Sequence, residues 1–256
     1  TCTSNIDGID LYYSNSNTVV KNTCNFNQNG ISLDFSDENS VDNNIFTRNI
    51  DGIALSYSDS NTVANNTCNS NDNFGIFLYN SVSNTVTNNA CGRNNESGIR
   101  LECSESNTLT HNTCSNNGEY GIHLYDSHQN TATDNICTNN RIGIYLCFSE
   151  NNTLTYNTCL SNTEYDIYLD RSDSNTVENN ITTVSYSTLL LLGGVLLLLP
   201  LGFIVLSSKR RMVSPKGDKD DIAVPVRYRL VSWLRNRRTL KHEDVDDHFE
   251  PDSSDG

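Results

Sequence analysis

The feature that most restricts the fold of this chain is a unit of 22 or 23 residues that recurs eight times before residue 183. Seven units open with Gly and the eighth with Asp, and in all eight Ile follows at once and Leu stands three residues after the opening residue. Ser lies six residues after the opening residue in every unit, and Asn lies nine and fourteen residues after it. The opening positions are Gly8, Gly30, Gly52, Gly75, Gly98, Gly121, Gly143 and Asp166.

The apolar residues of the unit lie two apart in short runs, which is the periodicity of β-strands. No unit contains ten or more residues with a helical period of about 3.6. A unit of this length with short strands and turns predicts one coil of a parallel β-helix. The fold class is therefore all-β, a solenoid of about eight coils over residues 1–182. Coils about 4.8 Å apart would give a rod of roughly 38 Å.

Stacked coils place equivalent side chains above one another, so the invariant positions of the unit predict ladders. The Ile, Leu and Val positions are expected to form a thin inner core. The Asn positions are expected at turns, because Asn tolerates unusual backbone angles and its amide can bond the next coil. The predicted structural ladders are Asn17, Asn39, Asn61, Asn84, Asn107, Asn130, Asn152 and Asn175, and Cys68, Cys91, Cys114, Cys137 and Cys159.

The cysteine position is apolar and faces inward, because Phe46 occupies it in the second coil, and Cys2 and Cys24 also share it. Buried thiols that pack as small apolar groups are the preferred interpretation. Stacked disulfides are a second, although stacked Cβ atoms lie farther apart than a disulfide prefers. A thiolate metal site is a third, but a linear column does not converge on one ion. Cys103 and Cys147 are out of phase, and we expect them to be exposed and reactive.

Residues 188–206 form a run of 19 residues without a charge, close to the roughly 20 that a membrane-crossing helix needs. A transmembrane helix is predicted over residues 187–208, and Lys209, Arg210 and Arg211 follow it directly. The positive-inside rule then places the β-helix outside the cell and the tail, residues 209–256, in the cytoplasm. We therefore predict a single-pass protein of the cell membrane.

Charge limits the partners of the chain. Residues 1–182 carry 21 acidic and 6 basic residues, which argues against binding to duplex nucleic acid. Residues 226–241 of the tail are basic and amphipathic, and are expected to lie on anionic lipid. A contact with a protein partner and an unbound tail are the alternatives. Because the chain starts with Thr1 rather than Met, we expect a fragment or a processed form.

Asn-x-Ser/Thr sequons suit an extracellular protein. They are weak indicators here, because a chain rich in Asn and Thr contains several by chance. The glycosylation candidates are Asn65, Asn95, Asn151 and Asn180.

The motif G-I-x-L-x-x-S-x-x-N-T-[VL]-x-x-N, as in Gly52 to Asn66 and Gly98 to Asn112, resembles the NosD-type, or CASH, right-handed parallel β-helix repeat. The resemblance implies the right-handed form of the fold. It also implies a family that includes a copper-handling periplasmic protein, enzymes that act on sugars, and carbohydrate-binding surface proteins. Copper is expected only from the family name, since Met212 is on the predicted cytoplasmic side and His111, His123 and His128 are more simply exposed polar residues. No metal site and no cofactor are therefore predicted.

Outward strand positions place aromatic and polar residues on successive coils, where a flat stripe of rings can stack on sugars. The alternative is that aromatic residues simply favour strands. The predicted sugar-binding stripe contains Phe77, Tyr79, Arg100, Glu102, His123, Tyr125, Tyr145, Tyr168 and Asp170.

Three functions remain open. The preferred hypothesis is a non-catalytic surface protein, a stalk or adhesive module that can recognise carbohydrate. The second is a polysaccharide lyase or hydrolase, for which Asp10 with Asp34, or Glu102 with Asp126, are candidate carboxylate pairs. The chain has no long loops to wall a cleft, so catalysis is the weaker hypothesis and no catalytic residue is assigned. The third is a NosD-like accessory protein for copper.

Overall fold

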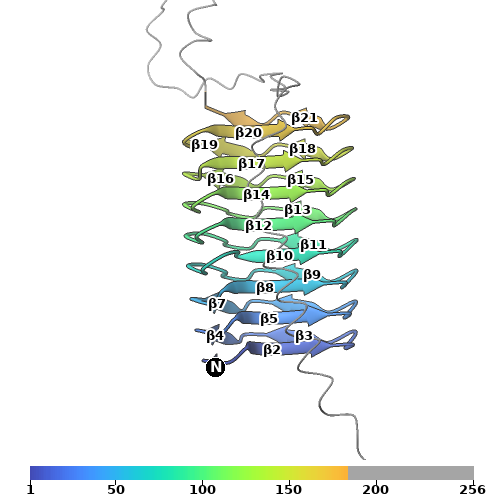
Figure 1. Cartoon of the computed structure of the whole chain (residues 1–256), viewed down its shortest axis with the longest axis vertical. Helices are drawn as coiled ribbons and strands as arrows, with labels where there is room; N and C mark the ends of the chain where they lie inside the picture. The colour runs from blue at the N-terminus through green and yellow to red at the C-terminus, as the bar shows by residue number, and fades with distance from the viewer. Residues whose placement is uncertain (184–256) are drawn as a thin grey trace, which may run out of the picture. The chain divides into compact units, whose positions relative to one another are not determined.

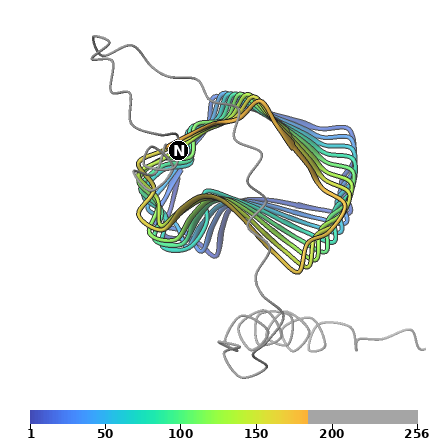
Figure 2. The same cartoon turned by 90° about the horizontal axis from the view of Figure 1, so that it is seen from above.

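Residues 1–183 of the computed structural model are described here, and they form the predicted parallel β-helix of eight coils (Figure 1). Seen along the stack, the coils superimpose with a small progressive rotation (Figure 2). The predicted membrane span and cytoplasmic tail lie outside the described residues. Within residues 1–183, no helix is long and apolar enough to cross a membrane.

Every strand pairs in parallel with its equivalents in the neighbouring coils, and the strands form three sheets. Sheet B contains β2 (Asp7–Tyr12), β5 (Asn29–Asp34), β8 (Asp51–Ser56), β10 (Ile76–Tyr79), β12 (Ser97–Glu102), β14 (Tyr120–Tyr125), β17 (Ile142–Cys147) and β20 (Tyr165–Asp170). Sheet C contains β3 (Thr18–Val20), β6 (Ser40–Asp42), β9 (Thr62–Ala64), β11 (Thr85–Thr87), β13 (Thr108–Thr110), β15 (Thr131–Thr133), β18 (Thr153–Thr155) and β21 (Thr176–Glu178). Sheet A contains β1 (Cys2–Thr3), β4 (Thr23–Asn25), β7 (Ile45–Thr47), β16 (Ile136–Thr138), β19 (Thr158–Leu160) and β22 (Ile181–Thr182), and single bridges connect its two halves.

One apolar core fills the solenoid along its whole described length. Each coil contributes Ile and Leu from sheet B and one small or branched apolar residue from sheet C, and every coil except the last contributes Cys or Phe from the third side. In the central coils these side chains are fully buried, as at Ile99, Leu101, Leu109 and Cys114. The alternation of the sequence thus predicts the inner face of each strand, because period-two residues share one face of a strand.

Each coil turns at four corners, and a non-glycine residue with a left-handed backbone stands at each. The structure differs from the sequence-based expectation in one respect, because the ladder Asn residues are not the ones with positive φ. The residue immediately before each ladder position takes that conformation. This leaves the Asn amide free to bond between coils. In the coil of Gly98 the positive-φ residues are Cys103, Ser106, His111 and Asn116, and they precede Ser104, Asn107, Asn112 and Asn117.

The Asn side chains at the corners connect three consecutive coils. The backbone N–H of Asn107 donates to Oδ1 of Asn130 (2.8 Å), and Nδ2 of Asn107 donates to the Ser81 carbonyl (3.0 Å) and to the same Oδ1 (3.2 Å). Oδ1 of Asn107 in turn accepts from the backbone N–H of Asn84 (2.8 Å). These bonds satisfy buried polar groups that no water reaches, so they offset the cost of the left-handed corners.

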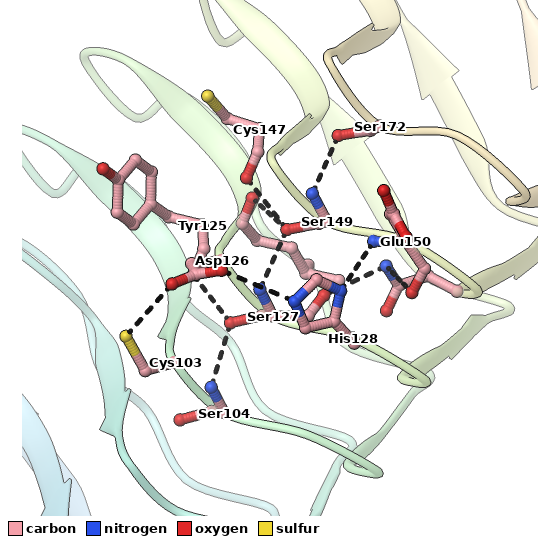
Figure 3. A network of polar contacts seen from close by, with 12 residues as sticks. Cys103, Ser104, Tyr125, Asp126, Ser127, His128, Cys147, Ser149, Glu150 and Ser172 are labelled. Carbon is pink, nitrogen blue, oxygen red and sulfur yellow. Dashed lines mark hydrogen bonds and ion pairs between the residues drawn. The ribbon is translucent and has the colours of Figure 1, made fainter.

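The Ser side chains at the end of sheet B form a further ladder (Figure 3). The N–H of Ser104 donates to Oγ of Ser127, whose N–H donates to Oγ of Ser149 (3.1 and 3.0 Å). The N–H of Ser149 donates to Oγ of Ser172 (3.0 Å). The invariant Ser of the unit is therefore a structural residue.

The opening Gly of a unit lies where the next coil leaves no room for a side chain. A Cβ at Gly98 would stand 2.7 Å from the Gly121 carbonyl oxygen and 2.8 Å from Cβ of Cys114. Asp166 lies in the last described coil, so no equivalent carbonyl stands above its Cβ within residues 1–183. Its carboxylate accepts from Nδ2 of Asn162 (2.8 Å) and from the N–H of Thr183 (2.6 Å), and takes the place of the next Asn in that column.

The cysteines of the predicted column are buried free thiols, and none of the nine cysteines forms a disulfide. Burial raises the pKa of Cys91, Cys114 and Cys137 well above the ordinary thiol value. The expectation that Cys147 is exposed is wrong, because it is buried at the end of β17 beside Asp170. Burial also raises its pKa. Cys103 is half-buried at a corner.

The column cysteines are expected to resist a maleimide reagent in the native protein and to react completely after unfolding. The reason is that a buried, protonated thiol is neither accessible nor nucleophilic. Mass spectrometry of the whole chain in detergent, labelled before and after guanidinium treatment, measures this, with Cys103 as the internal control that reacts natively. Native labelling at Cys91, Cys114 or Cys137, or a disulfide between any two of them, contradicts the expectation.

Candidate functional site

The outer face of sheet B carries two columns of side chains, in register from coil to coil. One column runs through Phe77, Arg100, His123, Tyr145 and Tyr168. The second column runs beside it through Tyr79, Glu102, Tyr125, Cys147 and Asp170. The structure therefore places all nine residues of the predicted stripe on one face, on strands β10, β12, β14, β17 and β20.

A buried ion pair stands at the centre of this face. Nη2 and Nε of Arg100 lie 2.9 and 3.3 Å from Oε2 of Glu102, and both side chains are almost inaccessible to solvent. The guanidinium also lies over the rings of Phe74 and Tyr125, 5.6 and 5.7 Å from their centroids. The Arg100 guanidinium is therefore held in one position by a carboxylate and two aromatic rings.

His123 completes the cluster in the next coil, and the expectation that it is an exposed polar residue is wrong, because its side chain is buried. Its Nδ1 lies 3.0 Å from Nη1 of Arg100. Burial, and after it the positive charge of Arg100, lower the pKa of His123 well below the ordinary value. The imidazole is therefore neutral at physiological pH.

Three rings of the stripe, those of His123, Tyr145 and Tyr168, stack on one another. His123 and Tyr145 are 4.9 Å apart with planes inclined by 17°, and Tyr145 and Tyr168 are 5.5 Å apart with the same inclination. Tyr165 stacks on Tyr168 at 4.7 Å. The neighbouring rings occupy these faces, so a ligand meets mainly ring edges and hydroxyl groups. The stripe differs in this respect from the flat stacking surface that the sequence suggests.

A second aromatic row, at the corner that follows sheet B, escaped the sequence analysis. Tyr13, Phe35 and Tyr57 are exposed and stack in parallel, with centroids 5.0 Å apart in each step. Tyr79 meets Tyr57 edge-on at 5.6 Å. Tyr13, Phe35 and Tyr57 occupy one position of the unit, five residues after the Gly. A search of that position for recurring rings would have found them.

Phe74 and Tyr120 also belong to the outer face, although simple alternation along the strand would place them inside. The strand bends at the Gly that follows each of them, so the residue before the Gly changes face. Tyr120 accordingly contacts His123 and Tyr145, with centroids 4.6 and 5.1 Å apart. Arg141 lies over the Tyr120 ring and pairs with Glu119 (2.8 Å) and Glu164 (3.3 Å).

The carboxylates considered for catalysis are not arranged as acid and base. Glu102 is bound to Arg100, whereas Asp126 lies at the next corner, where its carboxylate meets His128 and Cys103 (Figure 3). Asp10 pairs in register with Ser32 rather than with Asp34. One carboxyl on this face does titrate unusually, because burial and then nearby Glu96 raise the pKa of Asp51 to about 7.

The donor groups of residues 1–183 do not fit a copper ion. Nδ1 of His128 accepts from the N–H of Glu150 (3.0 Å), and its Nε2 faces Asp126 (3.4 Å). His123 has a guanidinium against Nδ1, and His111 is exposed at a different corner. In this part of the chain no three His, Cys, Asp or Glu side chains come together as a metal-binding group. Burial of the thiol column also disfavours the thiolates that Cu(I) needs. No step through copper is therefore derived.

The predicted glycosylation candidates differ in accessibility. Asn65, Asn95 and Asn151 are exposed. Asn180 is buried in a ladder, where Nδ2 donates to the Leu154 carbonyl (2.9 Å). Only the first three present an amide to solvent.

Comparison with known families gives one match. A family model described as periplasmic copper-binding protein (NosD) matches residues 1–119 and 95–192. No curated protein matches the chain.

Solved structures share the fold at low sequence identity. The periplasmic alginate epimerase AlgG is 21% identical with a TM-score of 0.67, over 70% of this chain and 48% of that one. The A-module of the mannuronan C-5 epimerase AlgE6 of Azotobacter vinelandii is 16% identical with a TM-score of 0.54, over 70% and 55%. The Dettilon tailspike protein is 18% identical with a TM-score of 0.57, over 69% and 43%. The chain thus spans about half the length of these proteins, and the likeness shows the fold alone.

Proposed function

Since the chain belongs to the family of the periplasmic copper-binding protein NosD, we propose that its β-helix works outside the cytoplasm and binds a polysaccharide along sheet B without cleaving it. The observation that carries this proposal is the register of sheet B. Because of this register, each coil from β10 to β20 presents aromatic or hydrogen-bonding side chains at equivalent positions of the face. A polymer of sugar units is a ligand with a matching linear repeat.

The side chains on this face suit sugar hydroxyl groups. Tyr79, Tyr125, Tyr145 and Tyr168 are half-buried, and burial raises the pKa of Tyr79 to about 12. Neutral phenols of this kind both donate and accept hydrogen bonds. Binding is favoured over cleavage because Glu102, the carboxylate at the centre of the face, is neutralised by Arg100.

The charge of the β-helix favours an uncharged polysaccharide. Residues 1–182 carry 21 acidic and 6 basic residues, and a field of that sign repels polyanions at long range. The few cations on or beside the face are already paired, Arg100 with Glu102 and Arg141 with Glu119 and Glu164. A neutral glycan meets no such repulsion.

The same proposal places the β-helix at a cell surface. Residues 187–208 would anchor it in the membrane as one helix, and the basic segment 226–241 would lie on anionic lipid or contact a protein in the cytoplasm. The family description as periplasmic supports the location of the β-helix outside the cytoplasm. In this arrangement the protein is an anchored binding or adhesion module.

Binding is tested on a glycan array with the whole chain in detergent, comparing wild type with Tyr145→Ala. The variant should bind the selected glycan about tenfold more weakly, because it removes one ring from the centre of the face. Tyr156→Ala is the matched control, since Tyr156 is an exposed Tyr of the same coil at the corner beyond sheet C. An equal loss of glycan affinity in both variants argues against this function, and so does a wild-type protein that binds no glycan.

A second candidate is an enzyme that modifies polysaccharides, which the cluster of Arg100, Glu102 and His123 favours because buried charged groups gather at functional sites. Two proteins of similar fold are an alginate epimerase and a mannuronan C-5 epimerase. Incubation of the glycan with the protein, followed by chromatography and proton NMR of the sugar, separates the candidates. Unchanged glycan supports binding alone, whereas shortened, unsaturated or epimerised chains support the enzyme.

A further inference from the structure

Nε2 of His123 is a buried polar atom that forms no hydrogen bond with any group of residues 1–183. The residue is 5% exposed. Leaving a buried polar group unsatisfied costs about 1–3 kcal/mol. Such a group is uncommon in folded proteins and calls for a functional or structural explanation.

Arg100 determines which nitrogen of His123 carries the proton. Nη1 of Arg100 lies 3.0 Å from Nδ1 of His123. A guanidinium has only donors, so Nδ1 has to be the acceptor. In a neutral imidazole the single proton is then on Nε2, which makes the unpartnered atom a donor.

Arg100 is restrained by its other contacts, so its hydrogen bond to Nδ1 of His123 is maintained. Its Nε and Nη2 both donate to one carboxylate oxygen, Oε2 of Glu102, and its Cζ lies 5.6 and 5.7 Å from the ring centroids of Phe74 and Tyr125. Two hydrogen bonds to a carboxylate and contact with two rings restrict the orientation of a guanidinium. The Nε2–H form of His123 is therefore built into the face.

We propose that Arg100 holds His123 as a fixed Nε2–H donor, and that this buried donor binds an acceptor oxygen of the saccharide on sheet B when the neighbouring aromatic side chains move aside. The inference rests on the proposed function and adds its anchoring point. His123 is then a binding residue that cannot act as a base through Nε2, because that nitrogen already carries a proton, and Arg100 is a positioning residue. The rings of Tyr120 and Tyr145 flank the donor at 4.6 and 4.9 Å.

The tautomer is tested by NMR on the whole chain in detergent, labelled with ¹⁵N-histidine. The resonances of His123 are assigned by their loss in His123→Phe. Wild type should show the Nε2–H pattern from pH 5 to pH 8, and Arg100→Gln should show a mixture of both neutral tautomers. An Nδ1–H pattern or an imidazolium in wild type at pH 7 overturns the inference, whether or not glycans bind.

The ligand contact is tested by adding cellohexaose, a neutral sugar, or hexagalacturonate, an acidic one. We expect the Nε2–H resonance to move, and His123→Phe to lower the affinity about five- to tenfold. His111→Phe is the matched control, since His111 is exposed at another corner, and its affinity should equal that of wild type. Movement with cellohexaose assigns a hydroxyl or ring oxygen as the acceptor, and movement with hexagalacturonate alone assigns a carboxylate.

The outcomes separate this inference from the proposed function. If the array detects a glycan but neither the His123 resonances nor the His123→Phe affinity change with it, the inference fails and the proposed function stands. If no saccharide binds at all, both fail. A tautomer as expected, with a resonance that moves on binding, supports both.

Discussion

Gly98→Ala is expected to lower the free energy of unfolding of the β-helix by at least about 3 kcal/mol. The added Cβ would lie 2.7 Å from the Gly121 carbonyl oxygen, 2.8 Å from Cβ of Cys114 and 2.8 Å from the Cys91 carbonyl oxygen. Two of these atoms are backbone atoms, so no side-chain rotation relieves the clash and the coils have to separate. The loss is measured from the midpoint of urea unfolding of the whole chain in detergent. The circular-dichroism signal of the β-sheets reports the fraction unfolded.

Asp166→Ala is the matched control for that variant, because the same position of the last described coil already accommodates a Cβ. It removes the acceptor of Asn162 Nδ2, which also donates to the Cys137 carbonyl (2.9 Å), and the acceptor of the Thr183 N–H. A loss of about 1 kcal/mol is expected. If Gly98→Ala is no more destabilising than Asp166→Ala, close approach of the coils does not explain the Gly column.

Asn112→Ala is expected to cost about 3–5 kcal/mol, because several buried hydrogen bonds disappear together. Oδ1 of Asn112 accepts from the backbone N–H and Nδ2 of Asn89, each at 3.0 Å. Its Nδ2 donates to the Val86 carbonyl (2.8 Å) and to Oδ1 of Asn135 (3.0 Å). Truncation leaves the Asn89 N–H buried without an acceptor, in the middle of the stack, where both neighbouring coils depend on it.

The control for the Asn ladder is Asn95→Ala, which changes an exposed Asn outside the ladders and is expected to alter stability by less than about 0.5 kcal/mol. Urea midpoints of the two variants give the comparison. Similar midpoints for Asn112→Ala and Asn95→Ala would mean that the inter-coil amide bonds contribute little. In that case the apolar core alone would account for the stacking.

The sequence predicts the coils well because a single spacing determines the core and the ladders together. Residues equivalent to Ile99, Leu101 and Asn107 recur in every coil at the same distances from the opening residue. Strand alternation is enough to place the Ile and the Leu inside. The left-handed corners were harder to assign. They fall on residues as different as Cys103 and His111, whose conformation is imposed by the ladder residue that follows them.

The candidate site was only partly predictable, for a physical reason. Alternation correctly places Arg100 and His123 outside, but it says nothing of the pairing between Arg100 and Glu102 or of the direction of the rings. Tyr120 was missed because the bend at Gly121 reverses the face of the strand. These features depend on the particular neighbouring side chains and not on the repeat, so a consensus sequence of the unit does not show them.

The turn before each Gly gives the fold a place where sequence change has little structural cost. The coils that are one residue longer carry the extra residue there, and three of those longer turns end in an aromatic ring, at Phe74, Tyr120 and Tyr165. The ladders on either side keep their spacing, so an insertion is absorbed locally while its last side chain reaches the outer face of sheet B. Evolution can therefore vary the side chains of this face coil by coil, without redesigning the scaffold that carries them.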